Sequence, residues 1–399
     1  MGCALLWPTA GHAEDEVRPD APARPIPSEP RPTQGPHTPA QEAIPQGIFT
    51  RFIHRAEELR PSLVRLTWKH AAGHDIVRHG VIVDASGHVL TAGAPIRARH
   101  DLVLARLFGG RHERAEVRAE DLESGLTLLH VPGTDLRPVR FRRFAPNQPE
   151  PNGMMALPAH ARSVPPLVSV PMGLEVALVT ADGGVGIGKV RAVDRLAEGT
   201  VESAGQRFPT VGGLVEAGLA ALPTDMGAPW IDANGVVVGL QITSGLGMPL
   251  DHIVEDANTR GVKIRPMPTA ARAVPSSIIR IVLPKLLAGS PLYRAGLGVE
   301  TVPADAAMRV HLCQRHGCHV VRAVEPEGPA ARAGLRLHDV ILRINGRQLR
   351  PHTRLKDVLL PFRPGDEVKL DILRKRKPLT VTLRLETRQV SPRIGDDRD

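Results

Sequence analysis

Short apolar stretches separated by turn residues recur along this chain from residue 62 to residue 243. The stretches are found at residues 62–68, 80–84, 88–92, 101–108, 126–131, 176–180, 188–193 and 235–243. Segments that alternate or run apolar between Gly, Pro and Ser turns are typical of antiparallel β-strands. The pattern therefore predicts a barrel or a sandwich for this region and argues against a helical bundle.

The composition is that of a globular chain with many turns. Of 399 residues, 38 are Gly and 38 are Pro, and 42% are hydrophobic, which is sufficient for a sizeable core. The formal net charge is +9, but the basic residues are spread along the chain and only 3% of residues are aromatic. We expect no nucleic-acid partner, because stacking platforms are scarce. We also expect no membrane span, because no apolar run is long enough.

A second unit follows the strand-rich region. A helical pattern at about 276–288 precedes strands expected at residues 319–324, 339–344, 367–373 and 379–385, with two short helical segments between them. This mixture predicts an α+β unit at 294–386.

The segment GPAARAGLRLHDVILRINGRQL (328–349) carries the signals of a helical turn, a buried strand and a tight turn. Pro329 suits the start of the helical turn, Gly334 suits its end, and Asn345-Gly346 reverses the chain. This segment resembles the core of a PDZ domain of the bacterial HtrA/DegP type. The resemblance implies a mainly β protein, in which a chymotrypsin-like double β-barrel is followed by an α+β PDZ domain.

The same resemblance implies a peptide-binding site. In PDZ domains a glycine-rich turn points backbone amides at the terminal carboxylate of a peptide, and the peptide adds a strand to the neighbouring sheet edge. The candidate residues are Arg294, Gly296, Leu297, Gly298 and Val299 for the carboxylate, and Leu355, Val358 and Leu359 for the last side chain of the peptide. The alternative is that 294–297 is merely a turn before a strand.

Three upstream segments resemble the catalytic segments of the HtrA protease domain. They are GVIVDASGHVLTAGAPI (80–96), DLESGLTLLHV (121–131) and LPTDMGAPWIDANGVVVGLQIT (222–243). The resemblance covers most of 48–270. It places the catalytic His, Asp and Ser at Ala94, Gly125 and Met226, and an oxyanion-hole glycine at Thr224.

These four residues do not supply the chemistry of the family. Acyl transfer needs a hydroxyl, an imidazole held by a carboxylate, and backbone donors that face the oxyanion. We therefore expect a catalytically inactive homologue, a pseudoenzyme of the trypsin-like class. A relocated active site is the alternative, because other hydroxyls and imidazoles are present at Ser86, Ser124, Ser203, Ser244, His79, His88, His100 and His130.

Cys313 and Cys318 flank a short segment that also contains His316. The spacing matches no standard zinc pattern, so a cross-strand disulfide is the favoured interpretation in an oxidising compartment. Free thiols and a metal site are the alternatives. We expect no resident metal and no cofactor.

The predicted organisation has six parts. They are a truncated signal peptide (1–13), a Pro-rich disordered tether (14–47), a trypsin-like domain (48–270), a linker helix (271–293), a PDZ domain (294–386) and a disordered tail (387–399). Residues 1–13 end in small residues like a signal peptide but lack its basic start, so a disordered leader is the alternative. We expect a periplasmic or secreted protein.

The sequence as a whole predicts a protein that binds polypeptide C-termini or unfolded segments. Its expected role is that of a chaperone, sensor or regulator in envelope protein quality control. The partners implied by the resemblance are further copies of the chain, for example in a trimer, or an active HtrA homologue. The alternative function is that of an active serine endopeptidase with a relocated or complemented active site.

Overall fold

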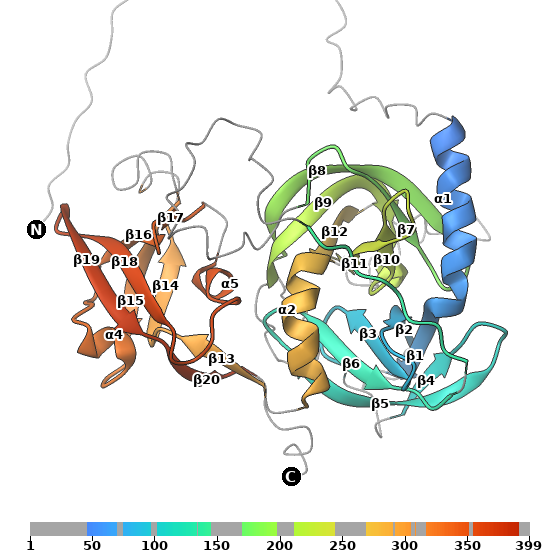
Figure 1. The fold of residues 1–399 in the computed structure, drawn as a ribbon, viewed down its shortest axis with the longest axis horizontal. Coiled ribbons are helices and arrows are strands. Elements are labelled where there is room, and N and C mark those ends of the chain that lie inside the picture. Colours follow the sequence, from blue (N-terminus) through green and yellow to red (C-terminus); the bar gives the residue numbers. More distant parts are fainter. Residues whose placement is uncertain are drawn as a thin grey trace, which may run out of the picture. The chain divides into compact units, whose positions relative to one another are not determined.

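The computed structural model describes residues 46–69, 75–96, 102–133, 135–144, 170–197, 211–243, 269–289, 292–304, 308, 317–350 and 354–390. The described chain is mainly β and contains two closed six-stranded barrels followed by a PDZ domain (Figure 1). The predicted fold class is confirmed.

The first barrel contains six antiparallel strands. They are β1 (Leu63–Lys69), β2 (Asp75–Ile82), β3 (His88–Ala92), β4 (Val103–Arg106), β5 (His112–Asp121) and β6 (Leu126–His130). They close in the order β1-β2-β3-β6-β5-β4. Strand β5 was not predicted from the sequence, because its apolar side chains are small and alternate with charged ones. Ala115 and Ala119 are buried in this strand, whereas Glu116 and Arg118 are exposed.

The second barrel repeats this architecture. Its strands are β7 (Glu175–Val179), β8 (Val185–Ala197), β9 (Val211–Ala221), β10 (Pro229–Ile231), β11 (Val237–Thr243) and β12 (Thr269–Pro275), closed in the order β10-β11-β12-β9-β8-β7. A short 3-10 helix, η4 (Pro223–Asp225), precedes β10 in the chain. The sequence did not predict β9 or β12, because β9 is rich in Gly and Ala and β12 is rich in Ala.

Two helices complete the packing of the barrels. Helix α1 (Gln46–Leu59) leads through a 3-10 turn, η1 (Arg60–Ser62), into β1, and helix α2 (Ser276–Leu287) follows β12. Phe52 of α1 and Ile279 of α2 are fully buried in one apolar cluster with Leu90 of the first barrel and Leu240 of the second. This shared core fixes the helices on the barrels. None of the described helices has the length and apolarity needed to cross a bilayer.

The PDZ domain is built around one antiparallel sheet in the order β14-β15-β16-β18-β19. Its strands are β14 (Val299–Pro303), β15 (His319–Val324), β16 (Val340–Ile344), β18 (Glu367–Arg374) and β19 (Lys377–Arg384), and the short β17 (Arg347–Gln348) pairs with β16. A separate pair joins β13 (Tyr293–Gly296) to β20 (Glu386–Gln389). The helical turns α4 (Pro329–Arg332) and α5 (Leu355–Val358) contribute Ala330 and Val358 to the core.

Trp230 and Trp68 provide a matched test of how polar groups stabilise the barrels. Both side chains are buried, but the indole N–H of Trp230 donates to Gln241 Oε1 at 2.8 Å, whereas that of Trp68 has no acceptor among the described residues. Trp230→Phe should therefore lower the free energy of unfolding by about 1–3 kcal/mol more than Trp68→Phe, because it leaves a buried oxygen unpaired. Urea unfolding of the two variants checks this, and equal losses would contradict it.

Candidate functional site

The three positions aligned with the catalytic triad lie close together at the junction of the barrels. Gly93, which precedes Ala94, donates its N–H to the carbonyl of Gly125 at 2.8 Å. A Cβ atom placed on Gly93 would overlap the sulfur of Met226. The fold therefore assembles the loops that contain Ala94, Gly125 and Met226 around Gly93.

Arg78 occupies the neighbouring space. Only 4% of this residue is exposed, its guanidinium donates to the carbonyl of Ala94, and it lies 5.0 Å from the centre of the Trp68 ring. Burial lowers the pKa of Arg78 to about 10, so the side chain remains charged at neutral pH. A buried cation beside Ala94 was not predicted from the sequence.

Gly125 is in a conformation that suits glycine. Its φ of +67° lies in the left-handed region, and an added Cβ would lie 3.0 Å from a methyl group of Ile242 and 3.2 Å from one of Val211. A side chain at this position would be strained by both its backbone and its neighbours. The turn therefore does not readily accommodate an aspartate in this structure.

The loop that carries Met226 is anchored through its backbone. The carbonyl of Met226 accepts the N–H of His79 at 2.8 Å, and Gly227 has a φ of +80°. Thr224 is exposed within η4, while the carboxylate of Asp225 accepts the N–H of Leu222 at 2.7 Å. Burial raises the pKa of Asp225.

The candidate histidines that the structure describes, and Ser124, have partners of their own. Burial lowers the pKa of His79 to about 4, and its Nδ1 accepts the N–H of Ala181 at 3.2 Å, so this imidazole is neutral at pH 7. His88 Nδ1 lies 2.7 Å from Asp84 Oδ2 within the hairpin turn that also contains Ser86. The Nε2 atom of His130 lies 3.0 Å from the carbonyl of Ser86. The ring of His130 also packs edge-on against the ring of His88. His100, Ser203 and Ser244 lie outside the described residues.

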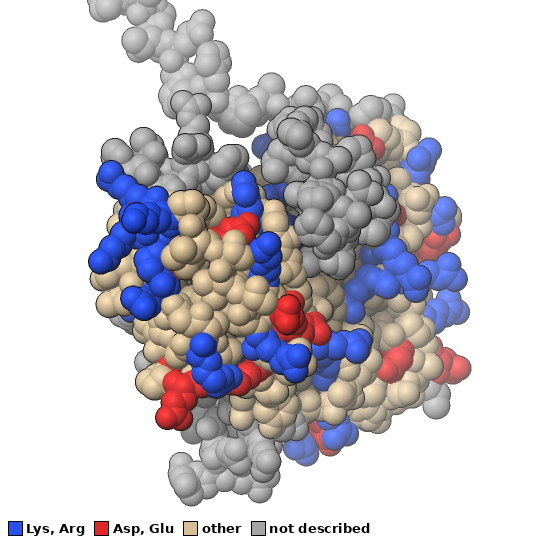
Figure 2. Space-filling model, turned by 60° about the vertical axis from the view of Figure 1, so that its left-hand side comes forward, with Lys and Arg blue, Asp and Glu red and all other residues tan. Residues whose placement is uncertain are grey.

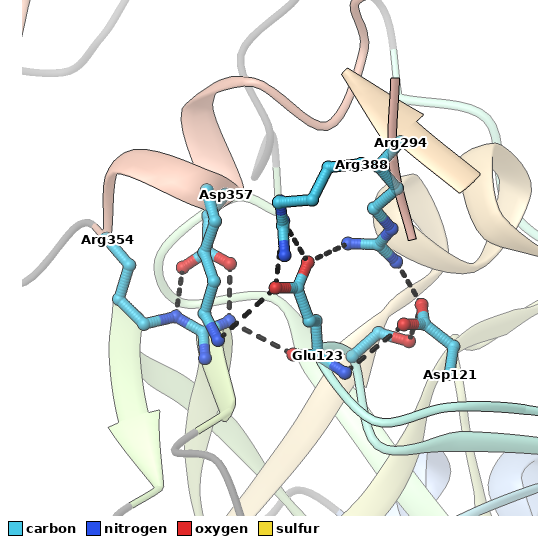
Figure 3. Close-up of polar contacts among 8 residues, drawn as sticks. Asp121, Glu123, Arg294, Arg354, Asp357 and Arg388 are labelled. Atoms are coloured by element: carbon cyan, nitrogen blue, oxygen red, sulfur yellow. Dashed lines mark hydrogen bonds and ion pairs between the residues drawn. The ribbon is translucent and has the colours of Figure 1, made fainter. Parts of the chain in front are cut away.

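The turn between β5 and β6 binds arginines of the PDZ domain (Figure 3). Arg294 of β13 donates to the carboxylates of Asp121 and Glu123, and Arg388 of β20 donates to Glu123 at 2.9 Å. Ser124 Oγ donates to Asp121 at 2.6 Å. The segment aligned with the catalytic aspartate thus provides carboxylates for an ion cluster.

Helix α5 joins the same cluster. Arg354 donates to the carbonyl of Glu123 at 3.1 Å and to Asp357 at 2.7 Å, while Lys356 Nζ lies 3.7 Å from the Glu123 carboxylate. Burial alone would raise the pKa of Glu123, but the charges of Arg388, Lys356 and Arg294 leave it lowered. Glu123 is therefore ionised at neutral pH and compensates several cations.

The predicted carboxylate-binding turn lies between β13 and β14. Gly298 has a φ of +69°, and the carbonyls of Leu297 and Gly298 accept the N–H groups of Ala330 and Glu325. The amides of Leu297 and Gly298 donate no hydrogen bond within the described part of the chain. Two donors are therefore available beside the free edge of β14.

The other peptide-site candidates are mostly buried. Leu355, Val358 and Leu359 lie in the PDZ core with Leu297, and Val299 is packed against that core while partly exposed. Arg294 is 6% exposed and is engaged by Asp121 and Glu123. The pocket for the last side chain of the peptide and the role of Arg294 in peptide binding both stay predictions.

Cys318 is disulfide-bonded and buried at the start of β15. Cys313 lies outside the described residues, so the predicted pairing of the two cysteines stays a prediction. Among the residues that the structure does describe, no group of three His, Cys, Asp or Glu side chains is placed to hold a metal ion.

Comparisons with known proteins agree with this architecture. The family of trypsin-like peptidase domains matches residues 79–240, and the PDZ domain family matches residues 295–385. A probable periplasmic DegP-like serine endoprotease of Ectopseudomonas mendocina is 24% identical over 86% of this chain, which spans 64% of that relative. The periplasmic pH-dependent serine endoprotease DegQ of Escherichia coli is 32% identical over 29% of this chain and 26% of its own.

The solved structures show the same fold. The structure of the HtrA-type protease AlgW with a tripeptide superposes with a TM-score of 0.55 and 19% identity, over 85% of this chain and 98% of that one. The chain therefore contains a trypsin-like peptidase domain and a PDZ domain, and it is similar in sequence to DegP-like serine endoproteases. The segments identified in the sequence lie within or beside these two matched regions.

The match to the trypsin-like peptidase domains corrects one expectation. We expected the chain not to be an enzyme, and that expectation is wrong. Residues 79–240 match the trypsin-like peptidases, and the relatives similar to this chain are named serine endoproteases. The expectation rested on four residues, whereas the match rests on a whole domain.

The ion cluster at Glu123 generates a stability prediction. Glu123→Gln should lower the free energy of unfolding by about 3 kcal/mol at pH 7, because it removes the buried carboxylate that Arg294, Lys356 and Arg388 share. The control is Glu216→Gln, which removes a half-buried pair with Arg272 and should cost about 1 kcal/mol or less.

The same cluster predicts a pH dependence. Because the pKa of Glu123 is lowered in the folded state, its stabilisation is present above the unfolded pKa of about 4.3 and is lost as the pH falls through the folded pKa. The difference between wild type and Glu123→Gln should therefore shrink in acid. Urea unfolding at several pH values measures it, and a pH-independent difference would contradict the proposed charge interaction.

Proposed function

We propose that this chain recognises polypeptide C-termini through its PDZ domain and acts in HtrA-type proteolysis in the periplasm or outside the cell. The observation that carries the recognition step is the free edge of β14 beside the backbone N–H groups of Leu297 and Gly298, which donate no hydrogen bond within the described part of the chain. An extended peptide could add a strand there, with its carboxylate at the turn. The relatives named as periplasmic support the location.

The geometry of the turn favours a carboxylate ligand. Gly298 adopts a left-handed conformation, in which successive backbone amides form a concave anion site. The carbonyls of Leu297 and Gly298 are directed into the domain by their hydrogen bonds to Ala330 and Glu325. These hydrogen bonds fix the turn through its carbonyl groups, so its backbone N–H groups are available to a ligand.

We further propose that the endopeptidase centre is complemented or relocated. The loops at Ala94, Gly125 and Met226 meet as the fold requires but provide no nucleophile of their own. Ser124 is bonded to a carboxylate, and His79 accepts a backbone N–H, so these two groups do not form a substitute pair. Assembly with an HtrA chain that carries the triad is the simplest arrangement compatible with these contacts.

The recognition step predicts a specific effect of Gly298→Ala. A Cβ at this position would lie 3.1 Å from Pro329, and the left-handed φ is unfavourable for alanine, so the amides should lose their alignment. We expect about tenfold weaker binding of a fluorescent peptide that ends in an aliphatic residue with a free carboxylate. Fluorescence anisotropy with the full chain measures the affinity.

The matched control is Gly365→Ala. Gly365 also has a positive φ, of +93°, but lies in another turn of the PDZ domain, with open space around it. Its substitution should leave peptide affinity unchanged. An amidated peptide should bind more weakly than the free acid. Equal affinities for the two peptides, or equal effects of the two glycine variants, would contradict carboxylate recognition at this turn.

A further inference from the structure

A basic surface lies at one end of the PDZ sheet, apart from the site described above. It is formed by the turn that leads into β16 and by the turn between β18 and β19, together with Arg322 of β15. The basic patch consists of Arg322, Arg336, Lys375, Arg376 and Lys377, with Leu337 and Leu379 among them. Lys and Arg side chains also gather in groups on the face drawn in Figure 2.

Hydrogen bonds hold these segments together. Asp339 accepts the N–H of Arg336 at 2.8 Å and both ends of the Arg374 guanidinium at 2.8 and 2.7 Å. The N–H of His338 donates to the carbonyl of Val321 at 2.9 Å, which places Arg322 beside the same turn. The basic patch is therefore one surface rather than a set of unrelated side chains.

The charge of the basic patch is not compensated. Asp339 is the one carboxylate in the two turns, and it is 1% exposed and paired with Arg374. All five basic side chains of the patch are exposed, and none forms an ion pair with the described part of the chain. Five positive charges therefore face the solvent together.

The backbone at the tip of the patch is unfavourable for the residues that it carries. Lys375 and Arg376 have φ values of +49° and +66° in the two-residue turn between Arg374 and Lys377. Such turns favour Asn-Gly, because other side chains are strained at positive φ. Long cationic side chains at both positions reduce local stability, which points to a role for their charge.

Two exposed leucines bear on which class of partner the basic patch would bind. Leu337 is 54% exposed and Leu379 is 41% exposed, whereas the patch contains no aromatic ring. We propose that the basic patch binds the surface of an anionic lipid bilayer, with the cations on the headgroups and the leucines in the interface. Strand β19 is the sheet edge opposite β14, so this contact leaves the proposed peptide edge free.

The test uses the full chain and sedimentation with phosphatidylcholine vesicles, prepared with and without phosphatidylglycerol. The variant is Lys375→Asn with Arg376→Gly, which removes two charges and gives the turn its preferred residues, so it should remain folded. Each lost charge should weaken binding to anionic vesicles about fivefold, which is about 25-fold in total. The control, Arg137→Gln with Arg140→Gln, removes two exposed charges elsewhere and should bind like wild type.

A second variant separates lipid from nucleic acid. Leu337→Ser with Leu379→Ser should weaken binding to anionic vesicles but leave binding of a short DNA duplex unchanged. The proposal is overturned if the chain does not prefer anionic vesicles, or if the turn variant binds as wild type does. It is also overturned if the control loses as much affinity as the turn variant. Tighter binding to DNA than to vesicles, with no effect of the leucines, would assign the patch to nucleic acid instead.

Discussion

The buried carboxylate of Glu123 connects the two halves of this protein. It compensates Arg294, Arg388 and Lys356, and its backbone carbonyl accepts Arg354, so strands β13 and β20 and helix α5 are all bound to one turn of the first barrel. Such a cluster is stabilising only while every member remains paired. Arg294 lies shortly before the proposed carboxylate-binding turn, so the cluster binds the strand that leads into that turn.

The turn that contains Glu123 also meets the loop of Gly93 at the junction of the barrels. Gly125 follows at a positive φ and is crowded by the second barrel, while Met226 and Arg78 occupy the space beside Gly93. These contacts fill the junction of the two barrels in this chain. An aspartate at position 125 would meet both backbone strain and steric conflict.

Much of this architecture could be predicted from the sequence. Strands with large apolar residues and clear turns, such as β3, β6 and β11, were visible, and local motifs located the PDZ core. Strand β5 was missed because Ala115 and Ala119 are small, β9 because it is rich in Gly and Ala, and β12 because it is rich in Ala. The partners of Glu123 were invisible, since Arg294 and Arg388 are distant in sequence and the pairing depends on tertiary structure.

Cleavage of an unfolded fluorescent casein decides whether this chain takes part in PDZ-directed proteolysis. It is measured for the full chain alone, against buffer, and for the chain co-purified with an HtrA protease whose own PDZ domain has been deleted, against that protease alone. We expect cleavage above the matching baseline in at least one of the two samples, reduced by Gly298→Ala but not by Gly365→Ala. Cleavage at the baseline in both samples, or the same cleavage with and without Gly298→Ala, would contradict such a role.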